Sequence, residues 1–98
     1  MHQYAHHIQP TLAKLLGDYR NKYQYSQERM SENLRISPRS YSDLELGKST
    51  FSGPSLLFFF LIMDDNERLL ALQELREVIF TIDEEWDVTQ PFHHIDRM

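Results

Sequence analysis

Residues 26–48 read SQERMSENLRISPRSYSDLELGK, and this stretch decides the fold. Ser26 is a natural N-cap for a short helix, because its side-chain oxygen can accept a hydrogen bond from a free backbone N–H of the first turn. Ser37 followed by Pro38 opens a second helix in the same way, with proline where a missing N–H does no harm. Gly47 can take the left-handed conformation that ends this helix. The stretch therefore predicts two short helices joined by a tight turn.

The apolar residues of the stretch have helical spacing. Met30 and Leu34 lie four residues apart on the first helix, and Tyr41 and Leu44 lie three apart on the second. Such spacings place side chains on one face of a helix. Ser31 is small enough to let the second helix approach the first. We therefore expect these residues to fix the angle between the two helices and to leave the outer face of the second helix exposed.

The chain on either side is also helical in pattern. Ahead of the stretch, a first helix presents one apolar face, and Pro10 suits its first turn. Behind the stretch, residues 52–54 open a fourth helix over the apolar run 56–63, which we expect to be buried nearly all round. The five residues of the first apolar face are Leu12, Leu15, Leu16, Tyr19 and Tyr23.

A fifth and longest helix follows. Asp64 and Glu67 have the spacing of a capping box, in which two side chains each accept from the other residue's backbone N–H. The apolar side of this helix is expected to comprise Leu69, Leu72, Leu75, Val78, Ile79 and Ile82. Beyond about residue 83 the helical pattern weakens, although Trp86, Val88, Phe92 and Ile95 are apolar.

The composition is that of one small folded domain. Ninety-eight residues with 41% hydrophobic side chains can bury a modest core. No cysteine is present, which excludes disulfides and thiolate metal sites. The longest apolar run is far shorter than the roughly 20 residues of a membrane-spanning helix. Because the N-terminus also lacks the regions of a signal peptide, we expect a cytoplasmic protein without membrane contact.

The net charge of −5 is unevenly distributed. Residues 1–60 carry +2, whereas residues 61–98 carry −7. The acidity thus lies behind the two short helices, and it does not argue against a nucleic-acid partner for them.

Two further clusters have ordinary interpretations. His6-His7 and His93-His94 are adjacent pairs, and neighbours on a helix diverge by about 100°, so neither pair is a natural chelate. The acidic residues between 83 and 87 have no nucleophile or phosphate-binding loop beside them. We therefore expect a solvated acidic tail, no metal, no cofactor and no enzymatic activity.

The 26–48 stretch resembles the Cro and phage-repressor (XRE-type) helix-turn-helix family. The resemblance spans about residues 9–64 and implies an all-α, five-helix, phage-repressor-like domain, followed by a C-terminal helical extension over residues 65–98. The implied function is sequence-specific binding of double-stranded DNA by a small transcriptional repressor that blocks polymerase at an operator. The matching residues are Ser26-Gln27, Met30-Ser31, Leu34, Ile36-Ser37, Tyr41, Leu44, Glu45, Gly47 and Lys48.

The resemblance also implies roles for individual residues. Arg20 and Glu45 occupy the places of an ion pair that holds the first helix against the third; the alternative is two surface charges that never meet. The second of the two short helices, residues 38–46, would read the major groove. The implied DNA contacts are Gln27, Lys48 and Ser49 to phosphates and Arg39, Ser40, Ser42 and Asp43 to base edges, with Ser37 at the start of the reading helix.

Three residues depart from the family pattern. Arg35 stands where the turn usually has glycine, and a left-handed residue other than glycine costs about 1–2 kcal/mol. Pro38 offers no donor to a base, and Asp43 can accept from cytosine but can also repel phosphates. An alternative, in which the helix-turn-helix is a scaffold for protein–protein contact as in an antitoxin-like or inhibitor subunit, is favoured by the weak basicity, Pro38, Asp43 and the −7 charge of residues 61–98. Because repressors of this type read two half-sites as dimers, we expect residues 65–98 to form a homodimer contact or a partner contact.

Overall fold

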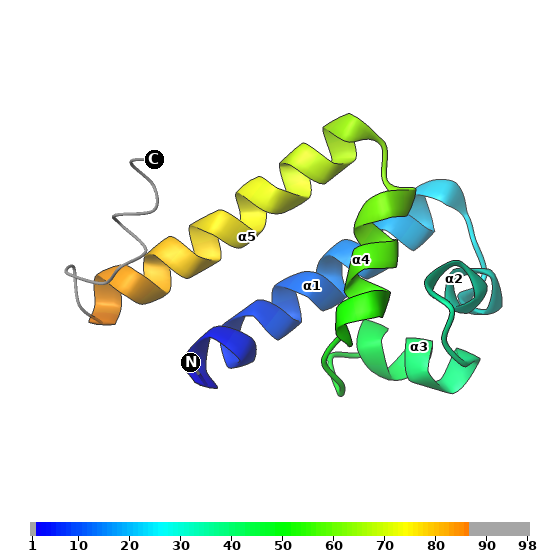
Figure 1. Cartoon of the computed structure of the whole chain (residues 1–98), viewed down its shortest axis with the longest axis horizontal. Helices are drawn as coiled ribbons and strands as arrows, with labels where there is room; N and C mark the ends of the chain where they lie inside the picture. Colours follow the sequence, from blue (N-terminus) through cyan, green and yellow to red (C-terminus); the bar gives the residue numbers. More distant parts are fainter. Residues whose placement is uncertain (1, 87–98) are drawn as a thin grey trace.

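Over residues 2–86, the computed structural model confirms an all-α fold of five helices. They are α1 (His2–Tyr23), α2 (Gln27–Leu34), α3 (Pro38–Glu45), α4 (Gly53–Ile62) and α5 (Asp65–Trp86). The structure describes the backbone of residues 2–86, in which there is no strand, and the side chains of residues 7–82. Figure 1 shows α2, α3 and α4 grouped toward one end of α1, with α5 lying along α1.

Serine side chains set the starts of the three shorter helices. Ser26 accepts a hydrogen bond from the Arg29 N–H at 3.0 Å, and Ser37 accepts one from the Ser40 N–H at 3.1 Å. Ser52 caps α4 in the same way. Each cap satisfies a backbone donor that the helix itself leaves free. The predicted starts of all three helices are confirmed.

The core joins all five helices around the packing of α2 against α3. Tyr41 and Leu44 of α3 are buried against Met30 and Leu34 of α2, and Ser31 is buried between them. The Ser31 hydroxyl donates to the Glu28 carbonyl at 2.7 Å, so this small polar side chain is satisfied inside the protein. The other buried residues of the cluster are Leu16, Phe59, Met63 and Ala71.

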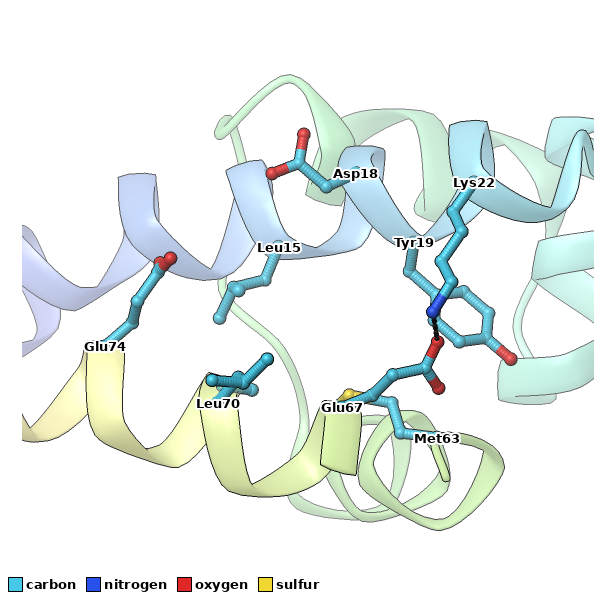
Figure 2. A pocket seen from close by; sticks show the side chains of 9 residues that line it. Leu15, Asp18, Tyr19, Lys22, Met63, Glu67, Leu70 and Glu74 are labelled. Carbon is cyan, nitrogen blue, oxygen red and sulfur yellow. Dashed lines mark hydrogen bonds and ion pairs between the residues drawn. The ribbon is translucent and has the colours of Figure 1, made fainter. Parts of the chain in front are cut away.

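The start of α5 is tied to the end of α1. The Glu67 N–H donates to the Asp64 side chain at 2.7 Å and the Asp64 N–H donates to Glu67 at 2.8 Å, which is the predicted capping box. Glu67 also accepts from Lys22 and Tyr23 of α1. Figure 2 shows the Lys22–Glu67 pair beside a hollow of about 170 Å³ between the two helices, with Leu70 at its side.

The predicted position of Pro10 is wrong. Pro10 lies inside α1, which begins at His2 instead of near the proline. A proline within a helix removes one backbone hydrogen bond, so other contacts must favour the additional turns. The turn before Pro10 carries Ile8, which lines a groove together with Leu75 and Ile79 of α5. Elsewhere along its length α1 packs on α5, and that contact helps to hold the whole helix in place.

The predicted all-round burial of α4 is also wrong. Phe59 and Ser55 face the core, but Leu57 and Leu61 on the opposite side are exposed. The cause lies in the arrangement of the helices, because α4 packs chiefly on α2 while α5 packs on α1. One side of α4 is therefore left uncovered.

The apolar side of α5 differs in part from its prediction. Ile82 is buried and Leu75, Val78 and Ile79 are half-buried, but Leu69 and Leu72 are exposed. Ala71 is the residue that faces the core near the start of the helix. Several predictions concern residues that lie wholly or partly outside the described part of the chain. They are the apolar roles of the Trp86 side chain, Val88, Phe92 and Ile95, the solvated acidic tail from 83 to 87, and the pairs His6-His7 and His93-His94.

Candidate nucleic-acid interface

The turn between α2 and α3 is built around a left-handed arginine. Arg35 has φ 59° and ψ 44°, and its N–H donates to the Glu32 carbonyl at 3.1 Å. Its guanidinium lies over the Phe58 ring of α4, 4.3 Å from the ring centroid, and donates to the Asn33 carbonyl at 2.8 Å. A cation–π contact contributes about 0.5–1 kcal/mol at exposed sites, which offsets part of the backbone strain. The arginine that replaces the expected glycine thus ties the turn to α4.

The inner side of α3 is fixed by one carboxylate that accepts four hydrogen bonds. Arg20 of α1 donates to Glu45 through Nε at 2.7 Å and through Nη2 at 3.1 Å. Gln27 donates through its amide at 2.8 Å, and Tyr41 through its hydroxyl at 2.9 Å. The Arg20–Glu45 pair expected from the sequence is therefore present. Together with Gln27 of α2, this pair connects α1, α2 and α3 at one point.

The environment of Glu45 shifts the ionisation of the groups around it. Burial raises the pKa of the Glu45 carboxyl, but the hydrogen bonds from Arg20, Gln27 and Tyr41 outweigh burial and hold that pKa below its ordinary value of 4.5. Burial, followed by the hydrogen bond to Glu45, raises the pKa of Tyr41. The hydrogen bond to Glu45 raises the pKa of Arg20. The carboxylate is thus charged at neutral pH, and Tyr41 stays protonated as its donor.

The outer side of α3 presents polar side chains to solvent. Ser37, Arg39 and Ser40 are exposed, and Ser42 and Asp43 are half-exposed. Arg39 forms no hydrogen bond or ion pair with any residue of the described chain, and neither does the Asp43 carboxylate. Arg39 and Asp43 are one helical turn apart and share a face. This side of α3 therefore has donors and acceptors that are available to a partner molecule.

The loop after α3 is held close to the helix that precedes it. Gly47 has φ 78°, the left-handed conformation expected there, and its carbonyl accepts from the Gln9 amide of α1 at 2.5 Å. The Lys48 N–H donates back to the Asp43 carbonyl at 2.8 Å. The Lys48 side chain is exposed and Ser49 is half-exposed. The loop thus holds these two residues at a fixed position at the end of α3.

The structure brings some of the predicted contact residues together. Ser40, Asp43 and Ser49 line a common hollow of about 280 Å³ between α3 and the start of α4. Gln27, predicted to contact a phosphate, is exposed, but in this structure its amide donates to Glu45. No described contact joins Arg39 or the Lys48 side chain to the residues of that hollow.

One exposed residue of this surface was not predicted from the sequence. Leu46, the C-cap residue that follows α3, is 63% exposed. It follows Ser42 by four residues and Asp43 by three, so it continues the outward face of the helix. An apolar side chain there can contact the methyl group of a thymine. The spacing from Ser42 was the signal that could have indicated this residue.

Comparisons with other proteins do not identify the chain: no family model, no curated protein and no solved structure matches it. The resemblance to phage repressors therefore stays a prediction that rests on the residues themselves. Within residues 2–86, none of the helices combines the length and the apolar character needed to cross a bilayer.

Proposed function

We propose that the protein is a sequence-specific DNA-binding transcriptional regulator of the phage-repressor type, acting in the cytoplasm with α3 in the major groove. The supporting observation is the contrast between the two sides of α3. Its inner side is locked by the four hydrogen bonds to Glu45, whereas its outer side carries Arg39 without an internal partner. A rigid helix with free polar groups is what reading of a groove about 12 Å wide requires.

The exposed residues have chemistry suited to both parts of a DNA contact. Arg39 can donate twice to guanine O6 and N7, and Asp43 can accept from cytosine N4. Ser37, Ser40 and Ser42 can donate or accept at neighbouring base edges. The contacts to phosphates, which position the protein on the duplex, would be made by Lys48, Ser49 and Gln27. Gln27 reaches a phosphate in this proposal by exchanging its hydrogen bond to Glu45.

The regulator acts in this proposal as a homodimer with a contact formed by residues 65–98, so that two copies of α3 read two half-sites. The exposed leucines of α5, Leu69 and Leu72, support such a contact, because monomeric proteins rarely expose large apolar patches. No ligand or cofactor enters the proposed mechanism.

The test begins with selection of bound fragments from random DNA by the full-length protein. Affinity for the selected site is then measured by fluorescence anisotropy for the wild type and for Arg39→Ala. We expect Arg39→Ala to lose about 1–3 kcal/mol of discrimination at one guanine position. Lys14→Ala is the control, because it also removes one positive charge, on the side of α1 near Glu74 of α5. It should leave the discrimination between bases unchanged. Equal base preference in the wild type and Arg39→Ala would rule out the assignment of Arg39.

A second candidate function, protein–protein recognition through the same helix, is favoured by Asp43. An unpaired carboxylate on the reading surface repels phosphates at every sequence, and it could instead accept from a basic partner protein. Salt dependence separates the two functions. A protein that contacts several phosphates loses DNA affinity steeply as salt rises, whereas a protein-binding scaffold yields an empty selection even at low salt.

A further inference from the structure

Leu46 is a large apolar side chain on an otherwise polar surface. It is 63% exposed at the end of α3, whereas the other exposed leucines of the described chain belong to α4 and α5. Figure 1 shows α5 lying away from α3. A single exposed leucine is ordinary on a protein surface, so the meaning of Leu46 depends on its position and on how firmly it is held.

The position of Leu46 continues the row of side chains proposed to read DNA. Leu46 follows Asp43 by three residues and Arg39 by seven, which is almost two helical turns, so the three residues share one face. The helical geometry extends as far as Leu46, because its φ is −80°, its ψ is −6° and its N–H donates to the Ser42 carbonyl at 3.0 Å. The row that begins with an arginine therefore ends with an apolar side chain.

The backbone beside Leu46 is held from both sides. The Gly47 N–H donates to the Leu44 carbonyl at 3.1 Å, and the Gly47 carbonyl accepts from the Gln9 amide of α1 at 2.5 Å. The end of α3 is thus tied to α1 as well as to its own last turn. A side chain on a fixed backbone loses less conformational freedom on binding, and it can discriminate better between binding partners.

We propose that Leu46 contacts the methyl group of a thymine, and so adds a thymine to the bases that α3 selects. In the major groove the C5-methyl of thymine is the apolar group that base edges present. Beside another base edge, the leucine would cover polar atoms without replacing their hydrogen bonds to water, which costs free energy. The inference rests on the proposed function and deepens it, because it names a base and the residue that recognises it.

The length of the row also gives the place of this thymine. Arg39 and Leu46 are separated by about 10 Å along the helix axis, at about 1.5 Å per residue. Successive base pairs are about 3.4 Å apart. With α3 lying along the groove, the thymine is therefore about three base pairs from the guanine that Arg39 binds, and Asp43 faces the base pairs between them.

The first test uses the wild-type protein and the DNA site that it selects. Each thymine of the site is replaced in turn by deoxyuridine, which lacks only the methyl group, and affinity is measured by fluorescence anisotropy. We expect a loss of about threefold to fourfold, the value of one buried methyl group, at one thymine in each half-site. This thymine should lie about three base pairs from the guanine that Arg39→Ala no longer selects. A selected site in which no thymine responds to this replacement would overturn the inference.

The second test assigns the effect to Leu46. Leu46→Ala should bind the thymine and deoxyuridine sites equally, whereas the wild type distinguishes them. The matched control is Leu70→Ala, which removes a leucine of α5 that is 55% exposed and should keep the difference between the two sites. A difference that persists in Leu46→Ala, or that is lost in both variants, would overturn the assignment.

The two tests also separate this inference from the proposed function. An empty selection from random DNA would contradict the proposed function and this inference with it. Sequence-specific binding that shows no effect of deoxyuridine would overturn the role of Leu46 alone.

Discussion

The substitution Glu45→Gln tests the cluster that holds α3 in place. It removes the negative charge while it keeps the size and shape of the side chain. Each carboxylate oxygen of Glu45 accepts two hydrogen bonds: Oε2 from Arg20 Nε and Tyr41, and Oε1 from Arg20 Nη2 and Gln27. A glutamine has only one acceptor oxygen. Whichever way its amide is turned, two of the four donors then face an NH₂ group.

The expected loss follows from these two donors. A hydrogen bond to a charged group contributes about 1.5–3 kcal/mol, so two of them correspond to about 3–6 kcal/mol. The side chain of Arg20 is 26% exposed and that of Glu45 is 13% exposed, so water can replace part of the lost interaction. We therefore expect the free energy of unfolding to fall by about 2–4 kcal/mol. For a domain of this size the melting temperature should fall by about 10–25 °C.

The assay is urea unfolding followed by circular dichroism, with the slope of the transition checked for constancy. Asp18→Asn is the matched control, because it neutralises a carboxylate that pairs with Lys14 on the exposed surface of α1. That change should cost less than about 1 kcal/mol. A loss at Glu45→Gln no larger than that at Asp18→Asn would refute the view that this cluster fixes the three helices.

Two further predictions concern acid and the left-handed residues. The folded-state pKa of Glu45 lies below its ordinary value, so the stabilisation from its charge is complete above about pH 5 and is lost as pH falls through the folded pKa. The urea midpoint of the wild type should therefore drop more steeply between about pH 5 and pH 3 than that of Glu45→Gln. Parallel curves for the two proteins would contradict this. Gln24 has φ 58°, so Gln24→Gly should raise the free energy of unfolding by about 0.5–1 kcal/mol. Gly47 has φ 78°, so Gly47→Ala should lower the free energy of unfolding by about 1 kcal/mol. Urea unfolding measures both effects, and two unchanged midpoints would contradict the argument from backbone strain.

The features that the sequence predicted correctly depend on a few neighbouring residues. The caps at Ser26, Ser37 and Ser52 and the box of Asp64 and Glu67 involve atoms three residues apart, so the local sequence specifies them. The Arg20–Glu45 contact joins residues 25 apart, and it was accessible only through resemblance to a family. Local chemistry therefore predicted where α2, α3, α4 and α5 begin, but not how α1, α4 and α5 would pack.

The features that were predicted wrongly all depend on how the helices pack. An apolar run such as residues 56–63 indicates burial only if neighbours cover every side, and α5 packs along α1 instead. The same packing turns Ala71 inward in place of Leu69 and Leu72, and the start of α1 lies before Pro10. Periodicity alone gives each helix an apolar side but cannot state how many partners that side will have.

The two surfaces of this protein therefore differ in how far the sequence defines them. The proposed DNA surface depends on single side chains of opposed chemistry: Arg39 favours a base, while Asp43 opposes a phosphate. The apolar groove between α1, α4 and α5 depends on the arrangement of three helices and on leucines that no neighbour covers. In the proposed DNA-bound form, a dimer contact through residues 65–98 would fix the separation of the two α3 helices. The spacing of half-sites in DNA selected by the wild type would then depend on that contact, whereas the bases within each half-site would depend on Arg39 and Asp43.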